Sequence, residues 1–168
     1  MLNKSTLLRL QTQLDVLPFL LSDAQSETIR ARPPSGQWSA LENLAHLARH
    51  HEVFLVRLRR ILSENAPQLE QYRADKDAAW PEWTCLTLEE VLGRLKVLRK
   101  EVTDLVRGLT AAEADRVGIH SLYGKMSLAL WVEFFLLHEA HHLYVVMTRI
   151  SQVKRSLSTQ PTPSDDTL

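Results

Sequence analysis

The chain has 168 residues, the size of a single domain, and its 20 basic and 20 acidic side chains balance. Without an excess of positive charge, nucleic acid and anionic membranes are poor partners. The single cysteine, Cys85, excludes an intramolecular disulfide, and the apolar runs are too short to span a bilayer. We do not expect the start MLNKSTLLRL to act as a leader. We therefore expect a cytoplasmic protein that binds neither nucleic acid nor membrane.

Helices are predicted throughout, because apolar residues recur every three or four positions and only five glycines occur. Strands are hard to place anywhere in this pattern. A loop is predicted over residues 26–37, which include the run RPPSG. The predicted helices cover about residues 4–22, with a kink or late turn at Pro18, and then about 39–63, 87–108 and 127–150.

Two of the predicted helices begin with a capping-box pattern. Ser39 is followed three residues later by Glu42, and Thr87 is followed three residues later by Glu90. In this spacing the hydroxyl and the carboxylate each accept a hydrogen bond from a free backbone N–H at the helix start. The second helix is therefore expected to begin at Ser39 and the third at Thr87.

Four long amphipathic helices in one small domain predict an all-α fold, a four-helix bundle. Roughly 22 residues separate the second and third helices, enough to stretch beyond the ~37 Å length of a 25-residue helix. A long crossover at this point would make those two helices parallel. We expect the bundle to occupy residues 1–152, and the polar, proline-containing residues 153–168 to form a disordered tail.

The stretch LLHEAHHLYVV places three histidines inside an otherwise apolar run of the fourth helix. His138 and His142 are four residues apart and share the face that points into the core, whereas His141 points elsewhere. Burying two neutral imidazoles costs free energy unless each finds a partner, and a divalent metal is a partner that uses both. The alternative is a pair of core histidines that make ordinary hydrogen bonds.

A third ligand is sought on the second helix, because three ligands and an open position are the usual catalytic arrangement for zinc. The candidates are His46, His50 and His51. The apolar stripe of this helix includes position 51 and leaves His46 well off its centre, so periodicity alone ranks His51 first. That stripe consists of Leu41, Leu44, Ala48, Leu55, Leu58 and Leu62.

The pair of motifs WSALENLAHL and HEAHH, in this order, resembles the DinB/YfiT-like superfamily of metal-binding four-helix bundles, and the likeness extends from Leu7 to Ile150. The resemblance implies that His46, His138 and His142 form a metal triad, in place of a site with His51. It further implies an up-down-down-up topology, homodimers, and a divalent ion. Zinc or nickel is expected first, then iron, cobalt, copper or manganese.

The residues His138, Glu139 and His142 also match H-E-x-x-H, the signature of zinc metallopeptidases in which the glutamate is the general base. Glu139 is turned about 100° from His138 on the helix, so it is our candidate catalytic group through a metal-bound water, or else a hydrogen-bond acceptor for an imidazole N–H. The plainer interpretation is a carboxylate on the helix surface, paired with a nearby cation.

The superfamily that the sequence resembles includes transferases and isomerases that use low-molecular-weight thiols such as bacillithiol or mycothiol. It also includes proteins regarded as metal-dependent hydrolases. We therefore predict a metal-dependent transferase that acts on a small molecule through a thiol, or a hydrolase that uses metal-bound water. The rival interpretation is a non-catalytic metal-binding stress-response bundle. Candidate anchors for an acidic substrate are Arg49, Tyr123, Lys125 and Arg149.

Other conspicuous residues have plain interpretations. Trp131 and Phe135 are expected in the core, and Trp38 is expected to pack at the start of the second helix. His120 falls in a predicted loop with no partner at a helical spacing. Cys85 is expected to be a small buried apolar residue.

Overall fold

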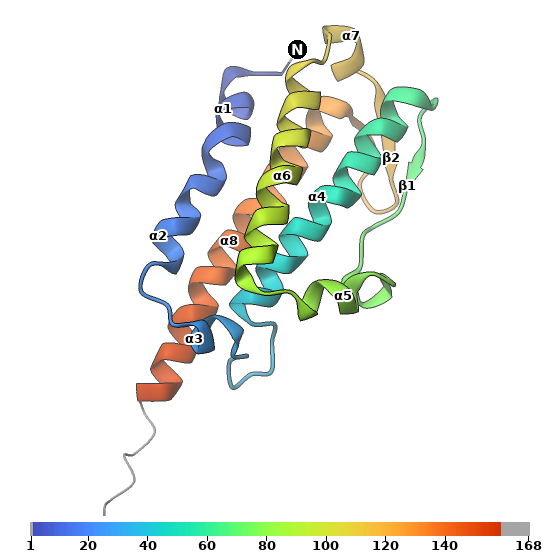
Figure 1. Ribbon diagram of the computed structural model, residues 1–168. Helices are drawn as coiled ribbons and strands as arrows, with labels where there is room; N and C mark the ends of the chain where they lie inside the picture. The colour runs from blue at the N-terminus through green and yellow to red at the C-terminus, as the bar shows by residue number, and fades with distance from the viewer. Residues whose placement is uncertain (1, 159–168) are drawn as a thin grey trace, which may run out of the picture.

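The computed structural model describes residues 2–158 and contains four long helical segments that form a bundle (Figure 1). The predicted four-helix bundle is confirmed. The first segment is α1 (Lys4–Thr12), which continues through the 3₁₀ turn η1 (Gln13–Val16) into α2 (Leu17–Leu21). The other three are α4 (Ala40–Ser63), α6 (Leu88–Arg107) and α8 (Leu128–Ser158).

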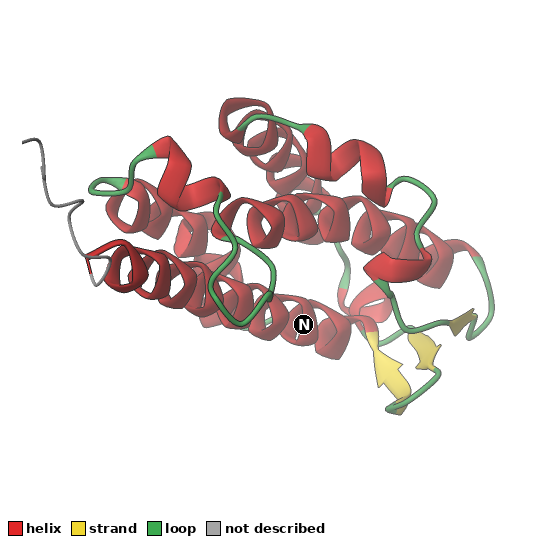
Figure 2. Ribbon diagram, turned by 90° about the horizontal axis from the view of Figure 1, so that it is seen from below, coloured by secondary structure: helices red, strands yellow, loops and turns green. Residues whose placement is uncertain are grey.

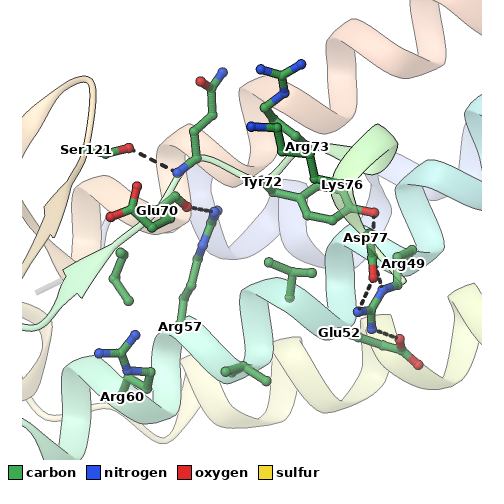
Figure 3. Close-up of a pocket in the computed structure, with 14 residues that line it drawn as sticks. Arg49, Glu52, Arg57, Arg60, Glu70, Tyr72, Arg73, Lys76, Asp77 and Ser121 are labelled. Carbon is green, nitrogen blue, oxygen red and sulfur yellow. Dashed lines mark hydrogen bonds and ion pairs between the residues drawn. The ribbon is translucent and has the colours of Figure 1, made fainter. Parts of the chain in front are cut away.

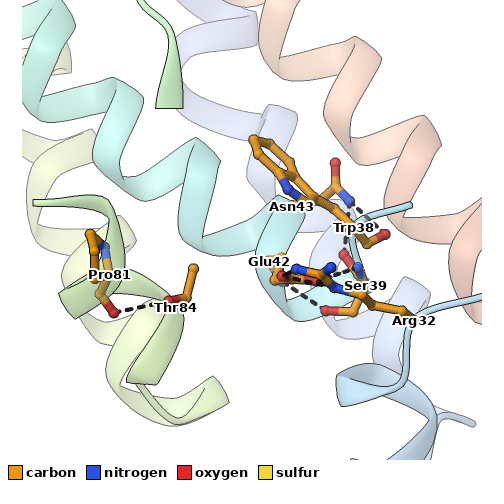
Figure 4. Close-up of polar contacts among 7 residues, drawn as sticks. All are labelled: Arg32, Trp38, Ser39, Glu42, Asn43, Pro81 and Thr84. Atoms are coloured by element: carbon orange, nitrogen blue, oxygen red, sulfur yellow. Dashed lines mark hydrogen bonds and ion pairs between the residues drawn. The ribbon is translucent and has the colours of Figure 1, made fainter. Parts of the chain in front are cut away.

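Both predicted capping boxes are present. Glu42 N–H donates to Ser39 Oγ at 3.1 Å, and Ser39 N–H donates to Glu42 Oε2 at 2.7 Å (Figure 4). The same pair of bonds joins Thr87 and Glu90, at 3.2 Å and 2.7 Å. Each box satisfies two backbone N–H groups at a helix start, which fixes where α4 and α6 begin.

The path between α4 and α6 is long and covers one side of the bundle. From the end of α4 it passes through β1 (Gln68–Leu69), the 3₁₀ turn η2 (Ala74–Lys76) and α5 (Trp80–Cys85). Figure 1 shows this segment returning beside α4, so that α4 and α6 run in the same direction. The crossover segment, residues 64–87, therefore lies beside the middle of α4, where the candidate site is found.

A small sheet was not expected from the sequence. The strand β2 (Val117–His120) pairs in parallel with β1 and antiparallel with β3 (Gly124–Ser127), and Figure 2 shows the strands beside the bundle rather than inside it. Strands of two and four residues are too short for alternation to be recognised. Gly118 lets β2 lie close to the bundle, because a Cβ there would come within 2.8 Å of Ile61 Cγ1.

Three features of the helices differ from the predictions: two additional short helices and the end of the last long helix. A short helix, α3 (Ser26–Arg30), lies in the predicted loop, and α7 (Ala111–Ala114) precedes β2. Helix α8 runs on to Ser158, past the predicted domain end at residue 152, because Val153 still buries its side chain against the bundle. The rest of the predicted tail, residues 159–168, lies outside the described residues.

The core fills the space between the four long helices. Trp131 and Phe135 expose 0% and 1% of their surface, as predicted for core residues. Cys85, expected to be buried, is exposed at the end of α5. Over residues 2–158, no helix combines the length and the apolar character that a membrane crossing requires.

Candidate metal centre

Helices α4 and α8 bring three histidines together. His46 comes from α4, and His138 and His142 come from successive turns of α8. One ring nitrogen from each lies within 4.8 Å of the other two, and the Nε2 atoms of His46 and His138 are 3.2 Å apart. We call these three residues the histidine cluster.

The spacing of these nitrogens fits a tetrahedral ion. Two imidazole nitrogens bound at about 2.0–2.1 Å to one tetrahedral metal lie roughly 3.3 Å apart. The 3.2 Å separation of His46 Nε2 and His138 Nε2 is close to this value, and all three nitrogens lie within 4.8 Å of one another, so any wider pair would have to approach by at most about 1.5 Å. The donor set is all nitrogen, which suits zinc, nickel, cobalt, copper or iron better than magnesium or calcium.

Burial keeps the three imidazoles neutral. It lowers the pKa of His46 from 6.5 to about 4. Burial first, and then the neighbouring histidines, lower the pKa of His138 to about 2 and that of His142 to about 3. Because metal binding requires the deprotonated ring, the cluster has its lone pairs available at neutral pH.

Asn43 orients one of the candidate ligands. Its Nδ2 donates to the carbonyl oxygens of Ser39, at 2.8 Å, and Trp38, at 3.4 Å (Figure 4). Its Oδ1 is therefore the acceptor for Nδ1–H of His142, at 2.9 Å. This bond leaves the lone pair on Nε2 of His142, as in metal sites where a second residue fixes the tautomer of a ligand.

Aromatic rings surround His46. The ring centroid of Trp38 lies 5.4 Å from that of His46, and those of Tyr72 and Trp80 lie at 5.5 Å and 6.1 Å. Trp38 precedes α4, as predicted, whereas Tyr72 and Trp80 belong to the crossover segment. These rings shield His46 from water on the side away from α8.

A pocket of about 420 Å³ adjoins the histidine cluster, and we call it the histidine pocket. One part of its wall comes from α4 and α8, and the rest from the crossover segment and the hairpin of β2 and β3. The helices contribute His46, His50, Arg57, Phe134, Leu137, His138 and His141, and the other segments contribute Gln71, Tyr72, His120 and Tyr123.

The remaining histidines of α4 and α8 do not join the cluster. His50 is buried in the pocket wall with its ring centroid 4.0 Å from that of His138, and its pKa is lowered well below 6.5 by burial. His51, which the apolar stripe ranked first, is fully buried and shares a hydrogen bond of 2.7 Å with the carbonyl oxygen of Leu47. His141 is exposed at the pocket mouth, as its helical phase predicted.

Glu139 lies in a different place from the one expected of a surface carboxylate. It exposes 0% of its surface and forms an ion pair with Arg99, while Gln13 Nε2 donates to it at 2.8 Å and His51 Nε2 lies 3.4 Å away. The predicted cation partner exists, but inside the core. We call Gln13, His51, Arg99 and Glu139 the Glu139 cluster. Both carboxylate oxygens are occupied there, so the residue is poorly placed to act as a base.

A larger cleft, of about 760 Å³, lies along α4 on the other side of residues 71 and 72 (Figure 3). At one end of this cleft the charges are paired: Arg49, a predicted substrate anchor, pairs with Asp77 at 2.6 Å and with Glu52 at 2.6 Å. Tyr72 donates to Asp77 at 3.0 Å. These contacts hold the crossover segment against α4.

Residues that the sequence did not indicate are Asn43, Arg57 and the pocket position of His120. Asn43 stands three residues before His46, so the two share a helix face, and that spacing is the one signal that could have found it. Arg57 and His120 reach the pocket only through contacts between segments distant in sequence. Tyr123 lines the pocket, as proposed for an anchor, whereas Lys125 and Arg149 do not.

The fold and the cluster define a class of protein, a four-helix bundle with a histidine triad between its second and fourth long helices. The chain matches the DinB superfamily over residues 9–146 and belongs to that superfamily. The family resemblance seen in the two motifs is thereby confirmed.

Curated relatives are named for metal-dependent chemistry. Two proteins of Oceanobacillus iheyensis each carry the name "Putative metal-dependent hydrolase". One is 26% identical over 135 residues and is matched over 78% of both chains. The other is 23% identical over 143 residues, which cover 85% of this chain and 82% of the relative.

Solved structures share the fold. YfiT from Bacillus subtilis, described as "a probable metal-dependent hydrolase with an unusual four-helix bundle topology", aligns with a TM-score of 0.74 at 18% identity, over 95% of this chain and 92% of YfiT. TT2238, a four-helix bundle protein, aligns with a TM-score of 0.64 at 24% identity, over 86% of this chain and 97% of its own. At these identities the likeness is one of fold.

Proposed function

We propose that the protein is a metal-dependent enzyme in which His46, His138 and His142 hold one divalent ion. The observation that supports this most directly is the convergence of three neutral imidazoles from two helices at the edge of the histidine pocket. His50 and His51, which could have supplied a closing fourth ligand, are not part of the group. The remaining coordination position would then face the pocket, as catalytic sites require.

When bound, the ion supplies Lewis acidity that lowers the pKa of a coordinated thiol or water. The protein's own residues position and shield this chemistry. Asn43 fixes the ring of His142, and the rings of Trp38 and Trp80 exclude water from His46. Zinc and nickel are the ions we expect first, because three neutral nitrogen donors bind both well.

Our first candidate reaction is transfer of a low-molecular-weight thiol to a small molecule. Glu139 is held inside the core by Arg99 and Gln13, so the carboxylate of the HEAHH motif is not available as a base. A thiol that binds as thiolate needs no such base. The thiol proton would pass to solvent when the thiol binds, and the sulfur–carbon bond would form as the leaving group departs with the electron pair of its own bond.

Hydrolysis by a metal-activated water is the second candidate. It is favoured by the names of the two curated relatives, both given as metal-dependent hydrolases. The peptidase version is disfavoured, because it needs Glu139 as the base and uses no ligand from α4. A non-catalytic metal-binding stress-response role would fit better with a fourth protein ligand in place of the open position.

Protein purified without an affinity tag should contain about one divalent ion per chain, measured by plasma mass spectrometry. The reactions are separated by two probes. With 1-chloro-2,4-dinitrobenzene and cysteine, thiol transfer gives a metal-dependent conjugate that His138→Ala abolishes. Metal-dependent hydrolysis of p-nitrophenyl acetate without conjugate formation would instead support the hydrolase. Metal at full occupancy with four protein nitrogen ligands in X-ray absorption would favour the non-catalytic role.

The homodimer implied by the family resemblance is retained as a proposal. Leu130, Leu137 and Tyr144 lie seven residues apart on α8 and expose 49%, 64% and 63% of their surface. Apolar residues at this spacing form one stripe along a helix, as in helix–helix interfaces. Light scattering should report a dimer that Tyr144→Glu weakens, and a monomer at all concentrations would contradict the proposal.

A further inference from the structure

Arg57 is a buried cation without a carboxylate partner. It exposes 6% of its surface, and its guanidinium carbon lies 5.5 Å from the ring centroid of Trp131. Nη2 donates to the carbonyl oxygen of Glu70 at 2.5 Å, as Figure 3 shows, and within residues 2–158 no ion pair to it is found. Its neighbour Arg60, by contrast, pairs with Glu64 at 2.7 Å.

An unpaired buried guanidinium is costly, because it gives up hydration without gaining a counter-ion. Burial lowers the pKa of Arg57 to about 10, so the side chain still carries its charge at neutral pH. A guanidinium has five N–H donors, and the bond to Glu70 uses one of them. The side chain lies between the larger cleft and the histidine pocket and lines both. On the side of the histidine pocket, where His120 also lies, a bound anion would use the other donors and offset the cost.

His120 adds a neutral donor beside Arg57. Its Nδ1 accepts the backbone N–H of Leu122 at 3.0 Å and that of Tyr123 at 3.3 Å, so the ring proton is on Nε2. The ring centroid of His120 lies 5.4 Å from that of Trp131, the ring that Arg57 also contacts. The turn after β2 thus fixes a second hydrogen-bond donor at the same end of the pocket.

The backbone positions of Arg57 and His46 are three turns of α4 apart, roughly 16 Å along the helix axis. The Arg57 side chain covers part of this distance, and its charge is near enough to His50 to help lower the pKa of that imidazole. Both residues nevertheless line the same pocket of about 420 Å³, with His50 between them. A ligand that reaches both ends must therefore be elongated.

We propose that Arg57 and His120 form an anion-binding end of the histidine pocket, and that the natural ligand is an elongated organic carboxylate whose reacting group lies at the histidine cluster. A planar guanidinium binds a carboxylate through two parallel hydrogen bonds. One cation and one neutral donor match a single negative charge better than a phosphate dianion. The inference rests on the proposed function for the chemistry at the histidine end, and on Arg57 and His120 for the anion.

The first test compares an acid with its neutral analogue. Cobalt(II)-loaded full-length protein is titrated with 6-mercaptohexanoate and with 6-mercaptohexanol, and the thiolate-to-cobalt charge-transfer band reports binding. We expect the acid to bind at least roughly tenfold more tightly. Arg57→Gln should remove this preference, and Arg60→Gln should retain it. The short pair mercaptoacetate and 2-mercaptoethanol should show no preference, because neither molecule spans the pocket.

The second test needs no metal and measures binding on the unaltered protein; the variant Arg57→Lys serves only to assign the signal. The side-chain Nε–H signal of Arg57, assigned by its loss in Arg57→Lys, is followed by NMR in the metal-free protein. It should move with 6-mercaptohexanoate and stay in place with 6-mercaptohexanol. A moving signal without a cobalt–thiolate band would support the anion site and contradict the thiol chemistry. Equal affinities for acid and alcohol, with an unmoved signal, would overturn the inference and leave the thiol chemistry standing.

Discussion

Two buried polar clusters meet the cost of burial in different ways: the histidine cluster joins α4 and α8, and the Glu139 cluster adds side chains from α6 and η1. The Glu139 cluster cancels charge internally, because the carboxylate of Glu139 meets Arg99 and the amide of Gln13 in the sealed core. The histidine cluster has no opposite charge to cancel: its rings stay neutral, face one another and open onto a pocket. The first cluster balances its charge without a ligand, although Nε and Nη1 of Arg99 have no hydrogen-bond partner among the described residues. The second cluster leaves imidazole lone pairs unused.

The comparison shows how far a sequence motif can mislead. His138 and Glu139 are neighbours in HEAHH, yet they belong to different clusters because adjacent helical residues point in directions about 100° apart. The sequence matches the peptidase signature, but in the structure Glu139 does not lie beside the two histidines of that motif. The predictions below test this division, from the largest expected effect to the smallest.

Loss of metal binding is the largest expected effect. His138→Ala should reduce metal content from about one ion per chain to a level near zero after dialysis, because two remaining imidazoles form a poor site. His141→Ala is the matched control, since His141 is exposed outside the cluster, and it should retain the metal. Plasma mass spectrometry measures both. Equal loss in the two variants would mean that the face of α8 assigned to the cluster is wrong.

The Glu139 cluster should matter for stability and not for metal. Glu139→Gln leaves Arg99 charged and unpaired in the core, so the free energy of unfolding should fall by about 3–5 kcal/mol in urea titrations. Metal content should remain at the wild-type level. The matched control is Glu101→Gln, because Glu101 pairs with Arg59 on the surface and should contribute at most about 1 kcal/mol. Full stability with abolished peptide hydrolysis would restore the peptidase interpretation.

Acid should destabilise the metal-free protein through the histidine cluster. The pKa of His142 is about 3 in the folded chain, against about 6.5 in the unfolded chain. Below pH 6.5 the unfolded chain therefore binds more protons, and the free energy of unfolding falls with decreasing pH, by up to ~1.4 kcal/mol per pH unit for each such histidine. Urea titrations at pH 7, 6 and 5 measure the slope, which should be smaller in His142→Gln. Identical slopes would show that His142 is protonated equally in both states.

The smallest expected effect concerns Asn43. Asn43→Ala removes the acceptor for Nδ1–H of His142, and metal affinity should fall about 10–100-fold without loss of the site. Competition with a chromophoric chelator measures the change. Asn43→Asp retains an oxygen at the same position and should recover most of the affinity. Unchanged affinity in Asn43→Ala would show that His142 keeps its orientation without this bond.

Much of the fold was predictable because it depends on local patterns. The recurrence of apolar residues located the four long helices, and the Ser39 and Thr87 capping boxes fixed two helix starts. The small sheet could not be predicted, because β1 and β3 are defined by their pairing with β2 and not by a sequence pattern of their own. The extension of α8 could not be predicted, because the sequence beyond Ile150 is mostly polar and a single apolar residue, Val153, continues the buried face of the helix.

The site was predictable only in part. Helical spacing alone paired His138 with His142, but His46 followed from the family resemblance. The apolar stripe pointed to His51, which is indeed more deeply buried than His46, at 0% against 6% exposure. The apolar stripe of a helix predicts which of its side chains are buried. A metal site also requires side chains from different helices to converge, and this depends on how α4 and α8 cross.

The crossover segment separates part of the pocket wall from the proposed metal ligands. The proposed metal ligands stand on α4 and α8, whose positions the packed core determines, whereas Gln71, Tyr72 and Trp80 reach the site from a segment with little regular structure. Changes in the length or composition of that segment can alter the shape of the pocket without moving the ligands. Replacing that segment alone is therefore a way to change which molecules fit the pocket while the three histidines stay in place.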